Sequence, residues 1–208
     1  MEEFTYKLAK KISSSLQHNK DQEAVLAYGL IAMVQVVSIL ITILCIGIIG
    51  GFAIEAVIIF LGVGYLRKST GGAHSDTMRG CYFISCISIL LLALCSKFIM
   101  FPLLSTEIYL CLCLISHVIC ILIIYKKAPV ESEKKPITSI DKRIRLRNQS
   151  LLIVFVYILI TVCCVLLSSN FFNLRSIAAS ICLLTMWQTF TLTSVGSYLL
   201  HKLDNILN

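Results

Sequence analysis

Residues 67–82 read RKSTGGAHSDTMRGCY and connect two long apolar segments of the chain. Within these sixteen residues lie two adjacent glycines, a histidine, an aspartate, a cysteine and three cationic side chains. Most of the remaining sequence consists of apolar segments and the charged connections between them. We therefore take residues 67–81, the motif loop, as the candidate functional site and expect the rest of the chain to position it.

The composition on either side of this loop is that of a membrane protein. The 208 residues are 58% hydrophobic and only 14% charged, far from the averages of soluble domains. An apolar run of about 20 residues can cross the hydrocarbon core of a bilayer as a helix. The sequence predicts an all-α integral membrane protein with six transmembrane helices, at residues 28–46, 51–66, 82–101, 108–125, 151–169 and 177–200. A cluster of glycines, at positions 47, 50 and 51, favours a reversal between the first two.

The distribution of Lys and Arg predicts how these helices are oriented. Positively charged residues favour cytoplasmic loops. With six helices, 16 of the 18 Lys and Arg side chains fall on one side of the membrane, and only Lys97 and Arg175 fall on the other. We therefore expect both termini and the motif loop on the cytoplasmic side of a multi-pass membrane protein. The formal net charge of +7 suits an anionic inner leaflet and not nucleic acid, because no aromatic platform accompanies the cations.

The N-terminal residues 1–24 lack the pattern of a signal peptide. Instead, an apolar residue recurs every four positions from Phe4 to Leu16, beside several lysines. This spacing is typical of an amphipathic helix on a membrane surface, and a cytoplasmic cap packed on the bundle would share it. We expect this arm to precede a single six-helix membrane domain at residues 25–208.

The one long polar connection is the basic loop at residues 126–148, which carries eight Lys and Arg side chains. Such a loop is expected to lie on an anionic leaflet, and it could also bind an acidic peptide. Polar residues within the predicted helices are rarer. Gln35, His117 and Gln188 lie at membrane depth and need hydrogen-bond partners, whereas Glu55 can reach the interface.

The sixth predicted helix has one face of small and hydroxyl-bearing residues. At 100° per residue, this face contains Cys182, Thr185, Thr189, Thr193 and Gly196. Side chains of this size permit close packing between helices in membranes. We expect the face to pack within the bundle, and it could also line a substrate path or support a homodimer.

Nine of the ten cysteines lie within the predicted helices, where a free thiol behaves as a small hydrophobic side chain. Cys81 is the exception. Residues 75–77 are good N-caps, so the next helix is expected to begin there and to hold Cys81 in its first turns. The helix N-terminus and the cations Arg67, Lys68 and Arg79 favour the thiolate, which is the nucleophilic form of cysteine. No C-x-x-C pair or Cys/His cluster has zinc spacing, so we expect no metal and no cofactor.

His74 is the candidate general base for Cys81. A base must approach the atom that it deprotonates to about 2.6–3.2 Å. Seven residues of continuous helix would separate the two side chains by about 10 Å along the axis. Gly71 and Gly72 allow positive φ angles and a tight reversal, so His74 is expected in a loop that folds back over the start of the helix. Asp76 either orients His74 or caps that helix.

The motifs of other membrane proteases are absent from the sequence. It has no H-E-x-x-H, no G-x-S-x-G and no aspartate within the predicted helices. Two alternatives to an enzyme stay open. One is a peptide exporter or carrier that uses the polar residues at membrane depth, and the other is a structural membrane partner or sensor.

The pattern Arg67-x-x-x-Gly71-Gly72-x-His74-x-x-x-x-x-x-Cys81, followed by an apolar helix, resembles the signature of the accessory gene regulator protein B (AgrB) family. The resemblance extends to the length, the basic N-terminal arm and the basic loop between the fourth and fifth helices. It implies a cysteine endopeptidase in the cell membrane of Gram-positive bacteria. Such enzymes remove the C-terminal tail of a short precursor peptide, AgrD, during production of a cyclic quorum-sensing signal.

Carried over by position, the resemblance makes Cys81 the nucleophile and His74 the general base, acting through an acyl-enzyme thioester. Lys126 and Lys127 match the basic loop of the family only loosely, as candidates for contact with substrate or lipid. The residues expected to support the site are Arg67, Gly71, Gly72, Asp76 and Arg79.

Overall fold

The computed structural model describes residues 2–15, 19–73, 75, 77–99, 105–131, 139–168 and 173–207. Over these residues it consists of helices and their connections, without a strand. The predicted all-α fold class is therefore confirmed. Residues up to Thr42 and residues from Ile43 onward form two compact units.

The first unit consists of helix α1 (Glu2–Ser15) and the N-terminal part of helix α2 (Lys20–Gly50). A capping box starts α2. The Asn19 side chain accepts a hydrogen bond from the backbone N–H of Gln22 at 2.8 Å, and the Gln22 side chain accepts one from the N–H of Asn19 at 3.0 Å. The N-terminal arm is therefore helical. Leu16, the last residue of its apolar repeat, lies outside the described residues, and the membrane-surface position of α1 stays a prediction.

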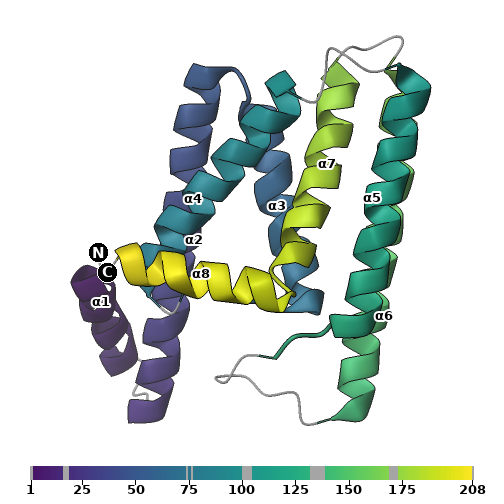
Figure 1. Cartoon of the computed structure of the whole chain (residues 1–208). Coiled ribbons are helices and arrows are strands. Elements are labelled where there is room, and N and C mark those ends of the chain that lie inside the picture. Colours follow the sequence, from purple (N-terminus) through teal and green to yellow (C-terminus); the bar gives the residue numbers. More distant parts are fainter. Residues whose placement is uncertain are drawn as a thin grey trace. The chain divides into compact units, whose positions relative to one another are not determined.

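The second unit begins with the end of α2 and holds the remaining helices. These are α3 (Ala53–Thr70), α4 (Met78–Leu94) with its π-helical continuation η1 (Cys95–Ile99), α5 (Thr106–Lys127), α6 (Ile140–Leu167), α7 (Asn173–Phe190) and α8 (Ser194–Leu207). α7 lies between α3 and α5 in Figure 1, and it packs against α3, α5 and α6. It buries mostly small and hydroxyl-bearing side chains, which let helices in membranes approach closely. α7 is therefore the helix around which this unit is built.

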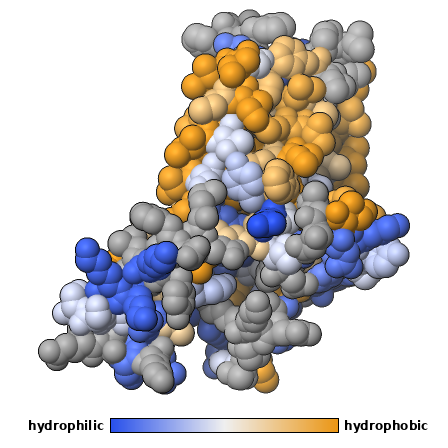
Figure 2. All heavy atoms as spheres, turned by 90° about the vertical axis from the view of Figure 1, so that its left-hand side faces the viewer, coloured by the Kyte–Doolittle hydropathy of each residue, from blue (hydrophilic) through white to orange (hydrophobic). Residues whose placement is uncertain are grey.

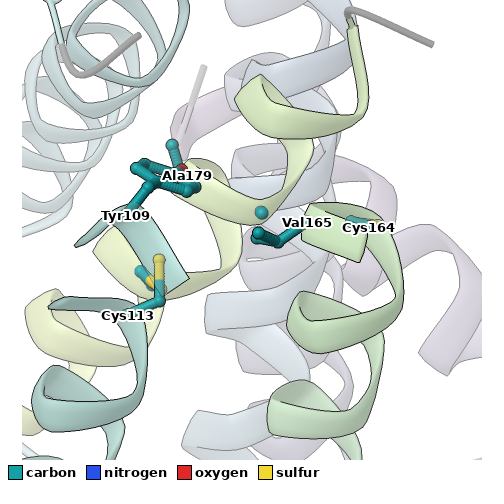
Figure 3. Close-up of a cluster of buried hydrophobic side chains, with 7 residues drawn as sticks. Tyr109, Cys113, Cys164, Val165 and Ala179 are labelled. Carbon is teal, nitrogen blue, oxygen red and sulfur yellow. The ribbon is translucent and has the colours of Figure 1, made fainter. Parts of the chain in front are cut away.

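α5, α6 and α7 share a cluster of buried side chains. Its members are Tyr109, Cys113, Cys164, Val165, Ala178, Ala179 and Cys182. Figure 3 shows Tyr109 and Val165 directed into the space between these helices. His117 lies one turn beyond Cys113, and its Nδ1 is 2.8 Å from the Cys113 carbonyl oxygen and 3.6 Å from the Cys182 sulfur. The interhelical partner expected for this histidine is therefore present.

The reversal predicted between the first two apolar runs is confirmed. α2 ends at Gly50, α3 begins at Ala53, and Gly51 between them has a φ of +74°. The N–H of Phe52 donates to the Gly47 carbonyl at 2.8 Å. A Cβ at Gly47 would lie 2.8 Å from the Cα of Ala53, so the two helix ends approach closely only because this residue is glycine.

Four helices of the described chain are long and apolar enough to cross a membrane: Asp21–Gly50, Met78–Phe98, Thr106–Lys127 and Ile140–Leu167. α7 and α8 are a fifth candidate if they form one bent span. The predicted span at residues 51–66 corresponds to α3, an 18-residue helix that includes Glu55, Arg67 and Lys68. Hydrophobic side chains cover much of the face shown in Figure 2, as expected for a surface in contact with lipid. The chain is thus a membrane protein with several spanning helices, whereas the number of six stays a prediction.

The prediction of one continuous helix at residues 177–200 is wrong. The chain bends by 86° between α7 and α8 (Figure 1). The Thr193 hydroxyl donates to the Phe190 carbonyl at 2.7 Å and accepts from the N–H of Gly196 at 3.0 Å, so it ends one helix and caps the next. A Cβ at Gly196 would lie 2.1 Å from the Phe190 carbonyl oxygen. The sequence remains hydrophobic on both sides of this corner, so the apolar pattern could not reveal the bend.

Glu55, which was expected to be able to reach the interface, is buried against other helices, with 2% of the residue exposed. Its Oε1 accepts hydrogen bonds from Lys97 Nζ at 3.1 Å and from the Ser176 hydroxyl at 2.7 Å. The ion pair joins α3 to η1, and the hydrogen bond from Ser176 joins α3 to α7. A carboxylate among apolar helices requires such a partner, because an unpaired buried charge is costly.

Lys97→Met is expected to lower the free energy of unfolding by about 3 kcal/mol, because it leaves the Glu55 carboxylate buried without a cation. The double variant Glu55→Gln/Lys97→Met removes both charges and should recover most of this loss. Thermal unfolding in detergent measures both variants. A double variant that is no more stable than Lys97→Met would show that the ion pair is not the cause.

Candidate active site

The motif loop begins where α3 ends, at two glycines with positive φ angles. Gly71 has a φ of +67° and Gly72 a φ of +120°, a region that residues with a side chain rarely adopt. The predicted tight reversal is therefore confirmed. Gly71 also lies against the start of the basic loop, where the N–H of Val130 donates to the Thr70 carbonyl at 2.9 Å. The two loops are joined at this point.

Side chains of α3 and α7 fix the backbone of the motif loop. Arg67 Nη2 donates to the Ala73 carbonyl at 2.6 Å. Gln188 is fully buried, and its Nε2 donates to the Gly71 carbonyl at 2.8 Å. The N–H of Ala73 donates to the Thr191 carbonyl at 3.1 Å. The partner that the sequence requires for Gln188 is thus the motif loop itself.

Arg67 also acts on Cys81 through its charge. Burial lowers the pKa of the Arg67 guanidinium from its ordinary value, and the electrostatic attraction of Cys81 opposes this effect. Arginine nevertheless stays charged in proteins. Arg67 therefore supplies a fixed cation beside the thiol together with a hydrogen bond to the loop.

α4 begins at Met78, with Thr77 as its N-cap. The Thr77 hydroxyl accepts a hydrogen bond from the N–H of Gly80 at 3.1 Å, and the N–H of Cys81 donates to the Thr77 carbonyl at 3.0 Å. The predicted helix start is confirmed, and Cys81 occupies the first turn. The backbone dipoles at the N-terminus of a helix create a positive potential there, which is favourable for an anion.

Cys81 lines a cavity of about 60 Å³ between α3, α4, α7 and α8. The lining includes Arg67, Ser75, Cys81, Ser85, Trp187 and Leu200. All ten cysteines of the chain are free thiols, and Cys81 is the one that lines this cavity. The thiol therefore lies in a small cavity whose lining combines apolar side chains with Arg67 and several hydroxyl groups.

His74 and Asp76, the predicted base and its neighbour, lie outside the described residues. The residues on either side of the histidine are described, and both Ala73 and Ser75 line the cavity that contains Cys81. The residues immediately before and after His74 therefore line the same cavity as the Cys81 thiol.

The other predicted residues are not in the lining given for this cavity. Arg79 is exposed on α4, and Lys126 and Lys127 are exposed in the last turn of α5. Their side chains are exposed outside the cavity.

The sequence patterns gave no indication that α8 contributes to the site. Leu200 lines the cavity, and Asp204, one turn further along the same helix face, is buried. Leu200 was expected to be the last residue of a spanning helix, and Asp204 was expected to lie beyond it. The signal that could have identified a separate helix is the polar group His201, Lys202 and Asp204 among leucines.

An apolar groove of about 380 Å³ adjoins the cavity. Ile84, Ser88 and Trp187 line both spaces. The rest of the groove is aliphatic, lined by Ile87, Leu91, Leu92, Leu203 and Ile206. A thiol beside a fixed cation can perform nucleophilic chemistry, and the groove provides a surface for an apolar segment of the molecule that is attacked.

Comparison with known proteins identifies relatives of the chain over nearly its whole length. The family model described as Accessory gene regulator B matches residues 5–192. Two curated AgrB-like proteins of Clostridium perfringens, one from strain SM101 / Type A and one from strain 13 / Type A, are each 30% identical to the chain over 203 residues. The matches cover 97% of this chain and 95% of each relative, and no solved structure matches it. The chain therefore belongs to the accessory gene regulator B (AgrB) family.

Proposed function

We propose that this protein is a membrane cysteine endopeptidase. It removes the C-terminal tail of an AgrD-like precursor peptide and promotes cyclisation of the remaining part to a thiolactone or lactone. Membership of the AgrB family supports this class of function. The observation that carries the proposal is the setting of Cys81. Its thiol lies in the first turn of α4, close to the cation of Arg67. The cavity that contains it is also lined by Ala73 and Ser75, the residues immediately before and after His74.

Cys81 is the proposed nucleophile and His74 the proposed general base. His74 takes the thiol proton, and the thiolate attacks the carbonyl carbon of the scissile peptide bond. When the C–N bond breaks, the departing amine takes a proton from His74. The N-terminal part of the precursor then remains on the Cys81 sulfur as a thioester. Arg67, Gly71, Gly72, Asp76 and Arg79 are the residues proposed to support this geometry.

The thioester retains an activated acyl group, so a second transfer is possible at little cost in free energy. A cysteine side chain of the peptide attacks the thioester carbonyl, Cys81 leaves as the thiolate, and a thiolactone ring closes; a hydroxyl group would give a lactone. Water would instead release a linear peptide. The cavity that contains Cys81 is small, and a bound peptide that fills it would exclude water and favour cyclisation over hydrolysis.

The proposed substrate is a peptide with apolar residues near the cleaved bond. The cavity is too small for a peptide backbone, so a substrate must widen it on binding. The adjoining groove is lined almost wholly by aliphatic side chains and Trp187. An apolar segment of the precursor fits this chemistry.

We place the site on the cytoplasmic side of a bacterial cell membrane, in a chain with six spans and both termini in the cytoplasm. The support is the asymmetry of charge, with 16 of 18 Lys and Arg side chains on that side. The N-terminal arm would then lie on the anionic inner leaflet. Lys126 and Lys127 are exposed and are proposed to contact lipid or the precursor.

A homodimer formed through the small-residue face of α7 is not supported by the packing. Cys182, Thr185 and Thr189 are buried within this chain, whereas Thr193 caps α8 and Gly196 lies in the first turn of α8. Any homodimer would therefore need a different surface.

The proposed function is tested by detection of the thioester. The purified protein in liposomes is mixed with the precursor peptide and analysed by intact-protein mass spectrometry. The wild type is expected to gain the mass of the N-terminal fragment, and hydroxylamine should remove it. Cys81→Ala and His74→Ala should show no adduct, whereas Cys163→Ala, which changes an exposed thiol on α6, should behave as wild type.

The alternative outcomes separate the competing hypotheses. Bound precursor without adduct or released tail would favour the exporter or carrier hypothesis. An adduct that persists in Cys81→Ala would assign the nucleophile to another residue. Release of linear peptide alone would support the protease and exclude cyclisation by this protein.

A further inference from the structure

We propose that Asp204 of α8 is a positioning residue, which holds the motif loop and the start of α4 in place for the chemistry of Cys81. This inference rests on the proposed function. Asp204 lies beyond residues 5–192, which match the family model. Its contacts within this chain are therefore what assign the role.

The Asp204 carboxylate is buried and joins α8 to the motif loop. Only 3% of the residue is exposed. Its Oδ1 accepts hydrogen bonds from the Ser75 hydroxyl at 2.5 Å and from the Thr77 hydroxyl at 2.6 Å, and its Oδ2 lies 3.4 Å from the Thr77 nitrogen. Hydrogen bonds to a charged acceptor are roughly twice as strong as neutral ones. One side chain of α8 therefore fixes two hydroxyl groups of the loop.

These two hydroxyl groups belong to the residues that position the proposed catalytic pair. Ser75 directly follows His74 in the chain. Thr77 has one hydroxyl proton, which it donates to Asp204, and this leaves its oxygen free to accept the N–H of Gly80 as the cap of α4. Cys81 lies in the turn that this cap begins. Asp204 therefore acts on both sides of the site through Ser75 and Thr77.

The close approach of Asp204 to α4 depends on Gly80. A Cβ at position 80 would lie 1.8 Å from Asp204 Oδ1, so glycine leaves the space that the carboxylate occupies. Leu200, one turn earlier on α8, lines the Cys81 cavity. The 86° bend before α8 turns the chain across the end of α7 and brings this face to the loop (Figure 1). A straight continuation of α7 would carry Asp204 away from it.

The test compares Asp204→Asn with wild type in the full-length protein, reconstituted in liposomes with the precursor peptide. The variant keeps the size of the side chain and removes the charge that both hydroxyl groups bind. The expected result is a kcat lowered about 10- to 100-fold, because small displacements of reacting groups have effects of this size. KM should change less than about twofold, since substrate contacts are retained. Glu107→Gln, at an exposed carboxylate of α5, should keep the wild-type values.

Coupling with Ser75 distinguishes positioning from a general loss of structure. Ser75→Ala alone should lower kcat about tenfold. In the Asp204→Asn background, the same substitution should lower kcat less than about twofold, because loss of the charge at position 204 has already weakened the hydrogen bond that Ser75 donates. Additive effects, or an unchanged kcat in Asp204→Asn, would overturn the role of Asp204.

Two controls make every outcome informative. If Asp204→Asn does not fold, as judged by thermal unfolding, Ser75→Ala alone decides, and a wild-type kcat in that variant would overturn the proposal. Wild type must also form the acyl adduct in the same preparation. Its absence would refute the proposed function itself, whereas a normal adduct with an unimpaired Asp204→Asn would refute only the role of Asp204.

Discussion

Cys81→Ser is expected to lower the rate of tail release by at least about 10⁴-fold, while the protein remains folded in the membrane. A serine hydroxyl is far less acidic than a thiol, so the helix N-terminus and Arg67 cannot generate an anionic nucleophile from it. Single-turnover release of a labelled tail, with enzyme in excess, measures the effect directly. No other thiol lines the described cavity, and none can replace it.

Cys45→Ser is the matched control for this prediction. It makes the same chemical change at an exposed cysteine of α2, and its rate should stay within about twofold of wild type. Retention of more than a tenth of the wild-type rate in Cys81→Ser would contradict the assignment of the nucleophile. An equal loss of tail-release rate in the two variants would show that any cysteine-to-serine change in a helix of this protein impairs it, and that the loss is not specific to Cys81.

The parts of this structure that the sequence predicted are those with a local cause. Apolar runs of helical length predicted the helices, and adjacent glycines predicted the positive φ angles at Gly71 and Gly72. A hydroxyl-rich segment before an apolar run predicted the start of α4, where Thr77 is the cap. In each case the signal and its structural effect lie within a few residues of each other.

The parts that it did not predict depend on partners far apart in the chain. Gln188 was known to need a partner, but the pattern could not name the Gly71 carbonyl, which is 117 residues away. The sequence also did not reveal that Glu55 pairs with Lys97, which lies 42 residues later. Asp204 likewise depends on a loop 127 residues before it.

The corner before α8 explains why the candidate site was only half predicted. Residues of the motif loop could be listed from sequence, because their types suit nucleophilic chemistry. The helices that pack over the loop could not be predicted in this way. The sequence remains hydrophobic from Thr193 to Gly196, so the pattern predicted one continuous sixth helix there. Leu200 lines the cavity beside Trp187 of α7 because the chain bends between α7 and α8.

Gly71→Ala is expected to lower the free energy of unfolding by roughly 4 kcal/mol, the second large effect that follows from this site. Gly71 has a φ of +67° and a ψ of −142°, a combination that is essentially restricted to glycine. A Cβ there would lie 2.0 Å from the Val130 carbonyl oxygen. The motif loop and the basic loop would have to separate, and the hydrogen bond from Gln188 to the Gly71 carbonyl would be strained.

Gly64→Ala is the control, because it makes the same change within α3, the helix that ends just before Gly71. No atom lies within 4 Å of a Cβ built at Gly64, so alanine there should be neutral or stabilise α3 by about 0.5–1 kcal/mol. Thermal unfolding in detergent should therefore move in opposite directions for the two variants, and tail release should fall at least about 100-fold only in Gly71→Ala. If Gly71→Ala kept both the stability and the rate of wild type, the backbone of the motif loop would not need the conformation from which Arg67, Ala73 and Cys81 surround one cavity.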